Sequence, residues 1–247
     1  MATHDHATQG GGDAAADDVP RQVDLRAGLS PVRDQGPRYT CLAFTVTAAH
    51  EAARSAHLGR LDDLAEDVLY WGCKTIDGDH APGSTFPSAA AALVRWGQPA
   101  EDLWPYDSAR DDTSAAYAPP PDALDPARCH RARLRQITPR PLTIKGVLAS
   151  GRVVMLGVRL SRGFFAPEGG RIPVPASAGE LEDGHAVLVV GYDDGQDPDD
   201  GALLCRNSWG TDWGDGGHAY LPYAYIERYG GEAWVVDEEP VGADQTV

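Results

Sequence analysis

The sequence predicts an α+β fold of two lobes, with helices in the first half of the chain and strands in the second. Three helical runs are expected in the first half, at residues 41–57, 62–71 and 87–96. The second half instead carries short β-branched apolar runs separated by Gly, Asp and Pro. Helices and strands do not alternate along the chain, so a parallel sheet built from βαβ units is not expected.

Turn residues divide the helical half. Gly59 and Gly97 are suited to end the first and third helices, because helix C-termini commonly need a glycine. An irregular stretch at 77–85 separates the second and third helices. Residues 98–127 are rich in Pro, Asp and Ala with little periodicity, so we expect a long surface connection there.

The strands of the second half are expected to form a small sheet. They cover 153–158, 185–192, 202–207, 218–221 and 233–237, with a further short strand at 23–26 and a short helix at 143–149. An acidic turn at 193–201 separates two of them. We therefore expect a disordered tail at 1–22, a helical lobe at roughly 35–130, a β lobe at roughly 131–237, and an acidic tail at 238–247.

The formal net charge of −16 bears on the partners of the chain. Nucleic acids and anionic membranes need a basic surface, so neither is expected as a partner. No stretch near 18 residues is continuously apolar, and the N-terminus lacks the basic and apolar regions of a signal peptide. We therefore expect a cytoplasmic protein.

Cys41 stands at the start of the first predicted helix, after the polar turn that begins at Gln35. Unpaired backbone N–H groups and the helix dipole favour a thiolate at that position, although a small buried residue is the alternative interpretation. The other cysteines are Cys73, Cys129 and Cys205. No two of the four have a C-x-x-C spacing, so neither a structural zinc site nor a disulfide scaffold is expected.

Two further polar residues stand at strand ends. His185 begins an apolar strand and Asn207 ends another. Each alone is more often structural. Together with a cysteine they are what thiol catalysis needs, because an imidazole can take the thiol proton while the amide oxygen orients the ring.

In these motifs the sequence resembles the papain-like cysteine proteases. Gln35-Gly36 is similar to the oxyanion-hole glutamine and its glycine, and the Cys41 region to the nucleophile helix. The segment 184–192 is similar to the histidine strand, and 207–214 (Asn-Ser-Trp-Gly-Thr-Asp-Trp-Gly) to the asparagine motif. Cys41 and His185 are 144 positions apart, within the roughly 130–150 typical of this family.

The resemblance implies a cleft between a helical lobe and a β-sheet or barrel lobe, and cysteine endopeptidase activity on peptide or protein substrates without metal or organic cofactor. Cys41, His185, Asn207 and Gln35 are then the catalytic residues. Residues expected to bind substrate or cover the site are Tyr39, Gly83, Ser84, Gly184 and Trp209. Two alternatives stay open: transfer of the acyl group to an amine, and a non-catalytic binding module.

The sequence departs from the family pattern beside the nucleophile. Arg38 and Tyr39 replace a disulfide-forming cysteine and a glycine, and Gly83-Ser84 stands for a glycine pair in the cleft. Cys73 and Cys129 fall where a second family disulfide would lie, although a cytoplasmic protein should keep it reduced. Residues 1–22 are too short and polar for the family's inhibitory pro-segment, so we expect none in this chain. If the activity is restrained, we expect an external inhibitor or regulator to restrain it.

Overall fold

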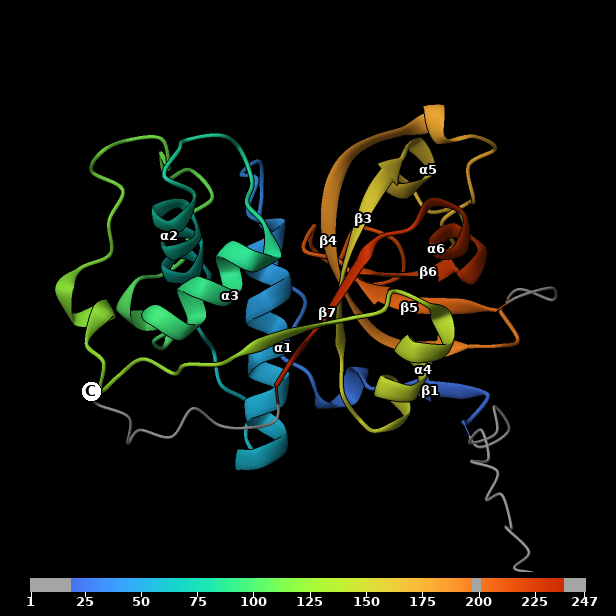
Figure 1. The fold of residues 1–247 in the computed structure, drawn as a ribbon, viewed down its shortest axis with the longest axis horizontal. Coiled ribbons are helices and arrows are strands. Elements are labelled where there is room, and N and C mark those ends of the chain that lie inside the picture. Colours follow the sequence, from blue (N-terminus) through green and yellow to red (C-terminus); the bar gives the residue numbers. More distant parts are fainter. Residues whose placement is uncertain (1–18, 197–200, 238–247) are drawn as a thin grey trace, which may run out of the picture.

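The computed structural model describes residues 19–196 and 201–237. It contains a helical lobe and a β lobe, which lie side by side in Figure 1. The main helices of the first lobe are α1 (Cys41–Leu58), α2 (Glu66–Asp77) and α3 (Phe86–Arg95). The second lobe is built on an antiparallel sheet, with the short helices α4 (Pro141–Ala149), α5 (Arg162–Phe165) and α6 (Tyr223–Tyr229). The predicted α+β fold of two lobes is confirmed.

The sheet has seven strands: six in the order β2-β7-β3-β4-β5-β6, and β1, which pairs with the end of β4 on the edge opposite β5. Its strands are β1 (Gln22–Asp24), β2 (Leu134–Ile137), β3 (Val154–Ser161), β4 (Leu181–Asp193), β5 (Ala202–Arg206), β6 (His218–Pro222) and β7 (Glu232–Val236). Both faces of β4 are buried, which explains its continuous apolar run. Ala186, Leu188 and Val190 belong to the core shared with α1, whereas Val187 and Val189 belong to the core of the β lobe.

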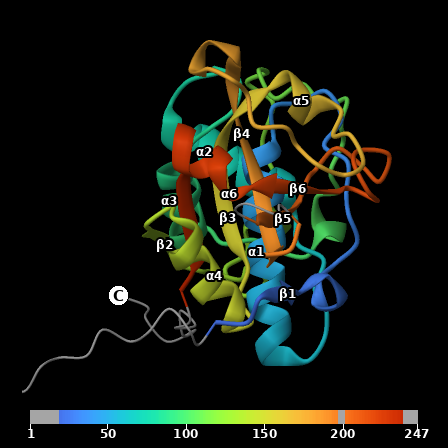
Figure 2. The same cartoon turned by 90° about the vertical axis from the view of Figure 1, so that its right-hand side faces the viewer.

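Helix α1 is the element on which the two lobes pack together. Its first half is buried, from Leu42 to Glu51, and it contacts β4 of the sheet as well as α2 (Figure 2). It ends before Gly59, whose φ of 65° lies in the left-handed region, as the sequence predicts. The same pattern ends α2 before Gly78, at φ 69°.

The second helix lies later in the chain than predicted. Residues 62–65 are extended, because Leu64 bridges to Ala100 and its N–H donates to the buried carboxylate of Glu51 at 2.8 Å. The helix also continues through Gly72, where a side chain would meet Ala92 of α3. Close packing of two helices therefore keeps a glycine inside α2 despite its low propensity.

The segment 98–127 is more than a surface connection, and that prediction is wrong in part. Gln98 is fully buried and its Oε1 lies 3.0 Å from His50 Nδ1. Tyr106 and Tyr117 pack their rings against the helical lobe, through Phe44 and Tyr70. The short elements β2, α5 and α6 were also not predicted.

Some predictions fall on residues outside the described ranges. These are the greater part of the tail at 1–22, part of the acidic turn at 193–201, and the tail at 238–247. Within the described residues, no helix has the length and apolar character to cross a membrane.

Candidate active site

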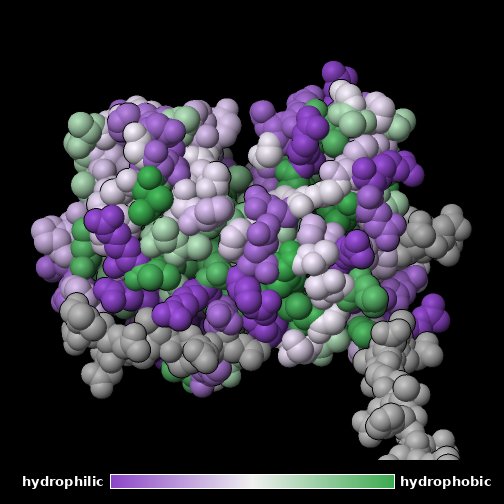
Figure 3. Space-filling view, viewed as in Figure 1, coloured by the Kyte–Doolittle hydropathy of each residue, from purple (hydrophilic) through white to green (hydrophobic). Residues whose placement is uncertain are grey.

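A cleft separates the lobes, and Figure 3 shows it as the hollow in the upper surface. Helix α1 brings Cys41 to this cleft, and β4 brings His185 from the other side. Cys41 is half-buried and is the first residue of α1, where backbone N–H groups have no intrahelical acceptor. The predicted nucleophile and the predicted base therefore line one cleft from different lobes.

His185 is held by the predicted asparagine. Its Nε2 lies 2.8 Å from Oδ1 of Asn207, which follows β5, and both residues are buried. An amide oxygen can only accept, so Nε2 carries the proton in this bond and Nδ1 is left to exchange one with a thiol. The same Asn207 oxygen accepts the Ser208 N–H at 2.8 Å, which fixes the amide orientation. The structure thus brings His185 and Asn207 together in the arrangement that a base and its orienting amide need.

Aromatic rings cover this pair. The Trp209 ring centroid lies 4.6 Å from that of His185, and Phe165 stacks on Trp209 at 5.4 Å. Phe164 lies edge-on to His185, and its carbonyl accepts the indole N–H of Trp213 at 2.9 Å. The role predicted for Trp209 agrees with this geometry. The two phenylalanines were missed because they lie on α5, although the pair Phe-Phe beside a glycine was a signal in the sequence.

Gln35 is oriented by three contacts. Its side-chain oxygen accepts the Ser208 hydroxyl at 2.7 Å, and its Nε2 donates one hydrogen to the Arg38 carbonyl at 2.6 Å. Its backbone N–H donates to Ser208 O at 2.8 Å. The amide therefore cannot flip without losing two bonds, and a second Nε2 hydrogen is left for another acceptor. This is the arrangement that a fixed oxyanion donor needs.

Burial opposes the separate charged forms of both reacting groups. It raises the pKa of the Cys41 thiol above the ordinary value of 9.0, although backbone N–H groups including that of Ala186 act in the other direction. It lowers the pKa of His185 to about 4 against the effect of Asn207. Burial therefore opposes the effect of the helix start, which the sequence predicts to favour a thiolate. A thiolate at neutral pH needs an imidazolium beside it.

The substrate-binding residues predicted from the sequence are mostly in the cleft. Tyr39, Gly83, Ser84 and Gly184 line it, and Tyr39 is 62% exposed. Trp209 lies against His185 instead. Phe86, Arg159 and Glu232 also line the cleft and were missed, because they come from three distant elements.

Glu232 places a carboxylate in the wall of the cleft. Its Oε2 accepts the Trp234 indole N–H at 3.0 Å, and among the described residues it has no ion pair. Gly157 faces it, and a side chain there would come within 3.0 Å of Glu232 Cγ. Because Gly157 has no side chain, the Glu232 side chain can occupy this position.

The candidate disulfide between Cys73 and Cys129 is not formed, because all four cysteines are free thiols. Cys73 is fully buried in the core of the helical lobe, where burial raises its pKa to about 12. The Cys129 thiol donates instead to the Ala123 carbonyl at 3.3 Å. The two thiols therefore lie in different environments, Cys73 in the core of the helical lobe and Cys129 beside the Ala123 carbonyl.

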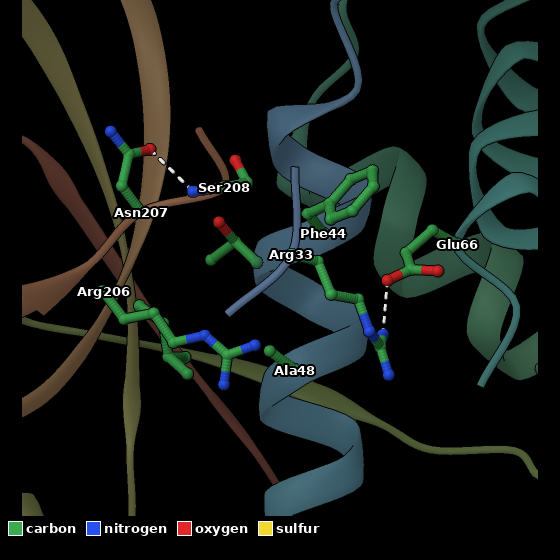
Figure 4. A pocket seen from close by; sticks show the side chains of 9 residues that line it. Arg33, Phe44, Ala48, Glu66, Arg206, Asn207 and Ser208 are labelled. Atoms are coloured by element: carbon green, nitrogen blue, oxygen red, sulfur yellow. Dashed lines mark hydrogen bonds and ion pairs between the residues drawn. The ribbon is translucent and has the colours of Figure 1, made fainter. Parts of the chain in front are cut away.

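Two arginines near Asn207, the buried Arg206 and the half-buried Arg33, connect the lobes, which sequence reasoning did not identify (Figure 4). Arg206 donates to the carbonyls of Ser30 and Pro31, each at 2.6 Å. Arg33 pairs with the buried carboxylates of Glu51 and Glu66. The segment that leads to Gln35 is therefore fixed to both lobes before it enters the site.

Three comparisons agree with this architecture. The model of the papain family of cysteine proteases matches residues 19–232. Peptidase 1 of Dermatophagoides pteronyssinus is 32% identical over 221 residues, covering 85% of this chain and 65% of that protein. Cysteine endopeptidase Rep1 of Oryza sativa subsp. japonica is 29% identical over 211 residues, covering 81% and 53%. The chain thus spans less than two thirds of the length of these relatives.

The crystal structure of xylellain, a cysteine protease from Xylella fastidiosa, has the same fold. Its TM-score with this chain is 0.77, at 24% sequence identity, and the match covers 91% of this chain and 88% of that one. The family match extends from β1 to the first residue of β7 and includes Gln35, Cys41, His185 and Asn207. This chain belongs to the papain family of cysteine proteases.

Proposed function

We propose that the protein is a cysteine endopeptidase that hydrolyses peptide bonds through a thioester on Cys41. The observation that carries the proposal is the hydrogen bond between His185 and Asn207, which lies under Trp209 in the cleft that Cys41 lines. A histidine with that partner is oriented to exchange a proton through its other nitrogen. The buried site excludes water from the pair and so strengthens the bond.

The first half of the reaction forms the acyl-enzyme. The Cys41 thiol proton passes to His185 Nδ1, and the sulfur attacks the carbonyl carbon of the peptide. The remaining Nε2 hydrogen of Gln35 and the Cys41 backbone N–H donate to the oxyanion. His185 then protonates the departing amine, the C–N bond breaks, and a thioester remains on Cys41.

The second half releases the acid product. His185 removes a proton from a water molecule, which attacks the thioester carbonyl. The Cys41 sulfur leaves and takes back its proton, so the enzyme returns to its starting state. Asn207 keeps the imidazole oriented in both halves through the 2.8 Å bond to Nε2. Gln35 offers the same donor to both tetrahedral intermediates.

A peptide-library cleavage profile of the protein and of Cys41→Ala tests this proposal. We expect internal cleavage by the protein and none by the variant, and labelling of Cys41 by a thiol-directed peptidyl epoxide. Cys129→Ser is the matched control, because Cys129 is the other half-buried thiol and should not affect cleavage. A folded protein that is neither labelled nor active would instead be a binding module, and aminolysed products on adding an amine would indicate acyl transfer.

A further inference from the structure

One residue of the active-site loop is buried in the helical lobe instead of facing the cleft. This loop, residues 35–40, runs from the oxyanion donor to the residue before the nucleophile. Arg38 is 8% exposed, and its guanidinium donates to Asp67 Oδ1 at 2.7 Å. Asp67 is fully buried in α2. A charged pair in such a place needs further hydrogen bonds to offset its lost hydration.

Those further bonds come from one segment, residues 105–117, which we call the strap. Arg38 donates to Asp112 Oδ2 and to the Asp107 carbonyl, each at 3.0 Å, and to the Tyr117 hydroxyl at 3.1 Å. The Tyr106 ring centroid lies 4.9 Å from the Arg38 guanidinium carbon. Four residues of the strap therefore contact a single side chain of the active-site loop.

The strap also touches the loop elsewhere. The Tyr106 hydroxyl donates to the Gln35 carbonyl at 2.7 Å and lies 2.9 Å from the Thr40 hydroxyl. Gly36 has φ 60°, and a Cβ there would come within 2.8 Å of Ser108. The strap thus contacts the loop at both of its ends and in its middle.

The backbone of Arg38 carries this restraint to the catalytic group. Its carbonyl accepts the Gln35 Nε2–H at 2.6 Å, which sets the direction of the other hydrogen on the same nitrogen. Movement of Arg38 would therefore move the donor that faces the oxyanion. An oxyanion donor contributes fully only when it is already positioned for the transition state.

We propose that Arg38, clamped between Asp67 and the strap, is a positioning residue for the Gln35 oxyanion donor. This inference rests on the proposed function. The loop begins at the catalytic glutamine, the arginine carbonyl binds that glutamine directly, and the arginine side chain is held by five polar or ring contacts. The restraint consists of ion pairs, hydrogen bonds and a ring contact, so it does not depend on redox state.

A double-mutant cycle tests the coupling. Arg38→Met is expected to lower kcat about thirtyfold with KM within twofold, because a lost oxyanion donor costs about a hundredfold or more and a misplaced one less. In a Gln35→Ala background the same substitution should lower kcat less than threefold. Arg54→Met is the control, since it breaks a partly buried ion pair with Asp62 in the same lobe, away from the loop.

A second variant guards against loss of folding. Tyr117→Phe keeps the ring but removes the hydroxyl shared by Arg38 and Asp67, and should lower kcat about threefold to tenfold with an unchanged far-UV circular dichroism spectrum. A fall of kcat by the same factor in both Gln35 backgrounds, or none with Tyr117→Phe, would overturn the inference. Alkylation of Cys41 by iodoacetamide needs no oxyanion donor, so its rate should not change in either variant. If the protein hydrolyses no peptide, the proposed function fails separately, and the acylation burst with a nitrophenyl ester still tests the inference.

Discussion

Replacing His185 by alanine should convert Cys41 from a neutral-pH nucleophile into an alkaline one. Burial raises the pKa of the thiol above 9.0 and lowers that of the imidazole to about 4, so neither charge is stable alone at pH 7. Each charge becomes favourable only beside the other, because a close ion pair presents a dipole and not a bare ion to the buried site. His185→Ala removes the imidazole, whereas the Cys41 thiol stays buried.

The size of the effect follows from the thiol pKa. Without the imidazolium, a thiol whose pKa exceeds 9.0 is less than about 1% ionised at pH 7. Alkylation of Cys41 at pH 7 should therefore fall about a hundredfold or more in His185→Ala, since the thiolate is the reacting species. The difference should shrink towards pH 10, where the thiol of the variant ionises by itself.

The assay is the rate of iodoacetamide alkylation from pH 4 to pH 10, with the labelled site identified by mass spectrometry. A Cys129→Ser background removes the other half-buried thiol, and Cys73 and Cys205 are fully buried. The protein should give a plateau that begins below pH 7, and the variant a rise above pH 8. Identical profiles that rise only above pH 8 would refute the ion pair and place the proton on the resting thiol.

Three further changes test other contacts of the site. Asn207→Ala removes the acceptor of the His185 Nε2–H and should lower kcat for peptide hydrolysis about tenfold to a hundredfold at nearly constant KM. Glu101→Gln should remove a fall in unfolding free energy of about 1 kcal/mol per pH unit between roughly pH 4.5 and 8, measured by urea denaturation. Glu232→Gln should lower kcat/KM about tenfold for peptides that place Lys or Arg in the cleft, and not for uncharged ones.

Burial raises the pKa of Glu101 from 4.5 to about 8, and the nearby carboxylate of Glu66 acts in the same direction. Folding therefore favours the protonated acid: its stabilising contribution is complete below pH 4.5 and is lost as the pH rises through 8. Glutamine keeps the oxygen that accepts the Tyr106 N–H at 2.6 Å and cannot ionise. An equal slope in Glu101→Gln would contradict this assignment. An unchanged kcat in Asn207→Ala would contradict the role given to Asn207, and an unchanged preference for charged peptides in Glu232→Gln would contradict the role given to Glu232.

Much of this site could be predicted because its signals are local in the sequence. The first helix has an apolar and alanine-rich run that ends at glycine, and β4 and β5 are continuous apolar runs. Cys41 begins α1, His185 lies within β4 and Asn207 directly follows β5. Predicting these elements therefore also placed the three residues. Their order and spacing then indicated the family.

The supporting contacts could not be predicted, because their partners are far apart in the sequence. Arg38 binds residues 29, 74 and 79 positions away, and a charge pattern does not indicate which of many carboxylates an arginine meets. The elements β2 and α6 were missed for a related reason. They are short, and β2 exists by pairing with β7 across about a hundred residues. The sequence shows the helix start that favours a thiolate but not the burial that opposes it.

These distant contacts explain how one loop can serve a site divided between two lobes. From the β lobe, Ser208 binds Gln35 through both its hydroxyl and its carbonyl. From the helical lobe, the Tyr106 hydroxyl donates to the Gln35 carbonyl, and Asp67 accepts from the buried guanidinium of Arg38 in the same loop. Cys41 and His185 belong to different lobes, so the distance between thiol and imidazole depends on how the lobes meet. The loop that carries the proposed oxyanion donor is bonded to both lobes, so any change in the contact between the lobes would alter the proposed nucleophile, base and donor together.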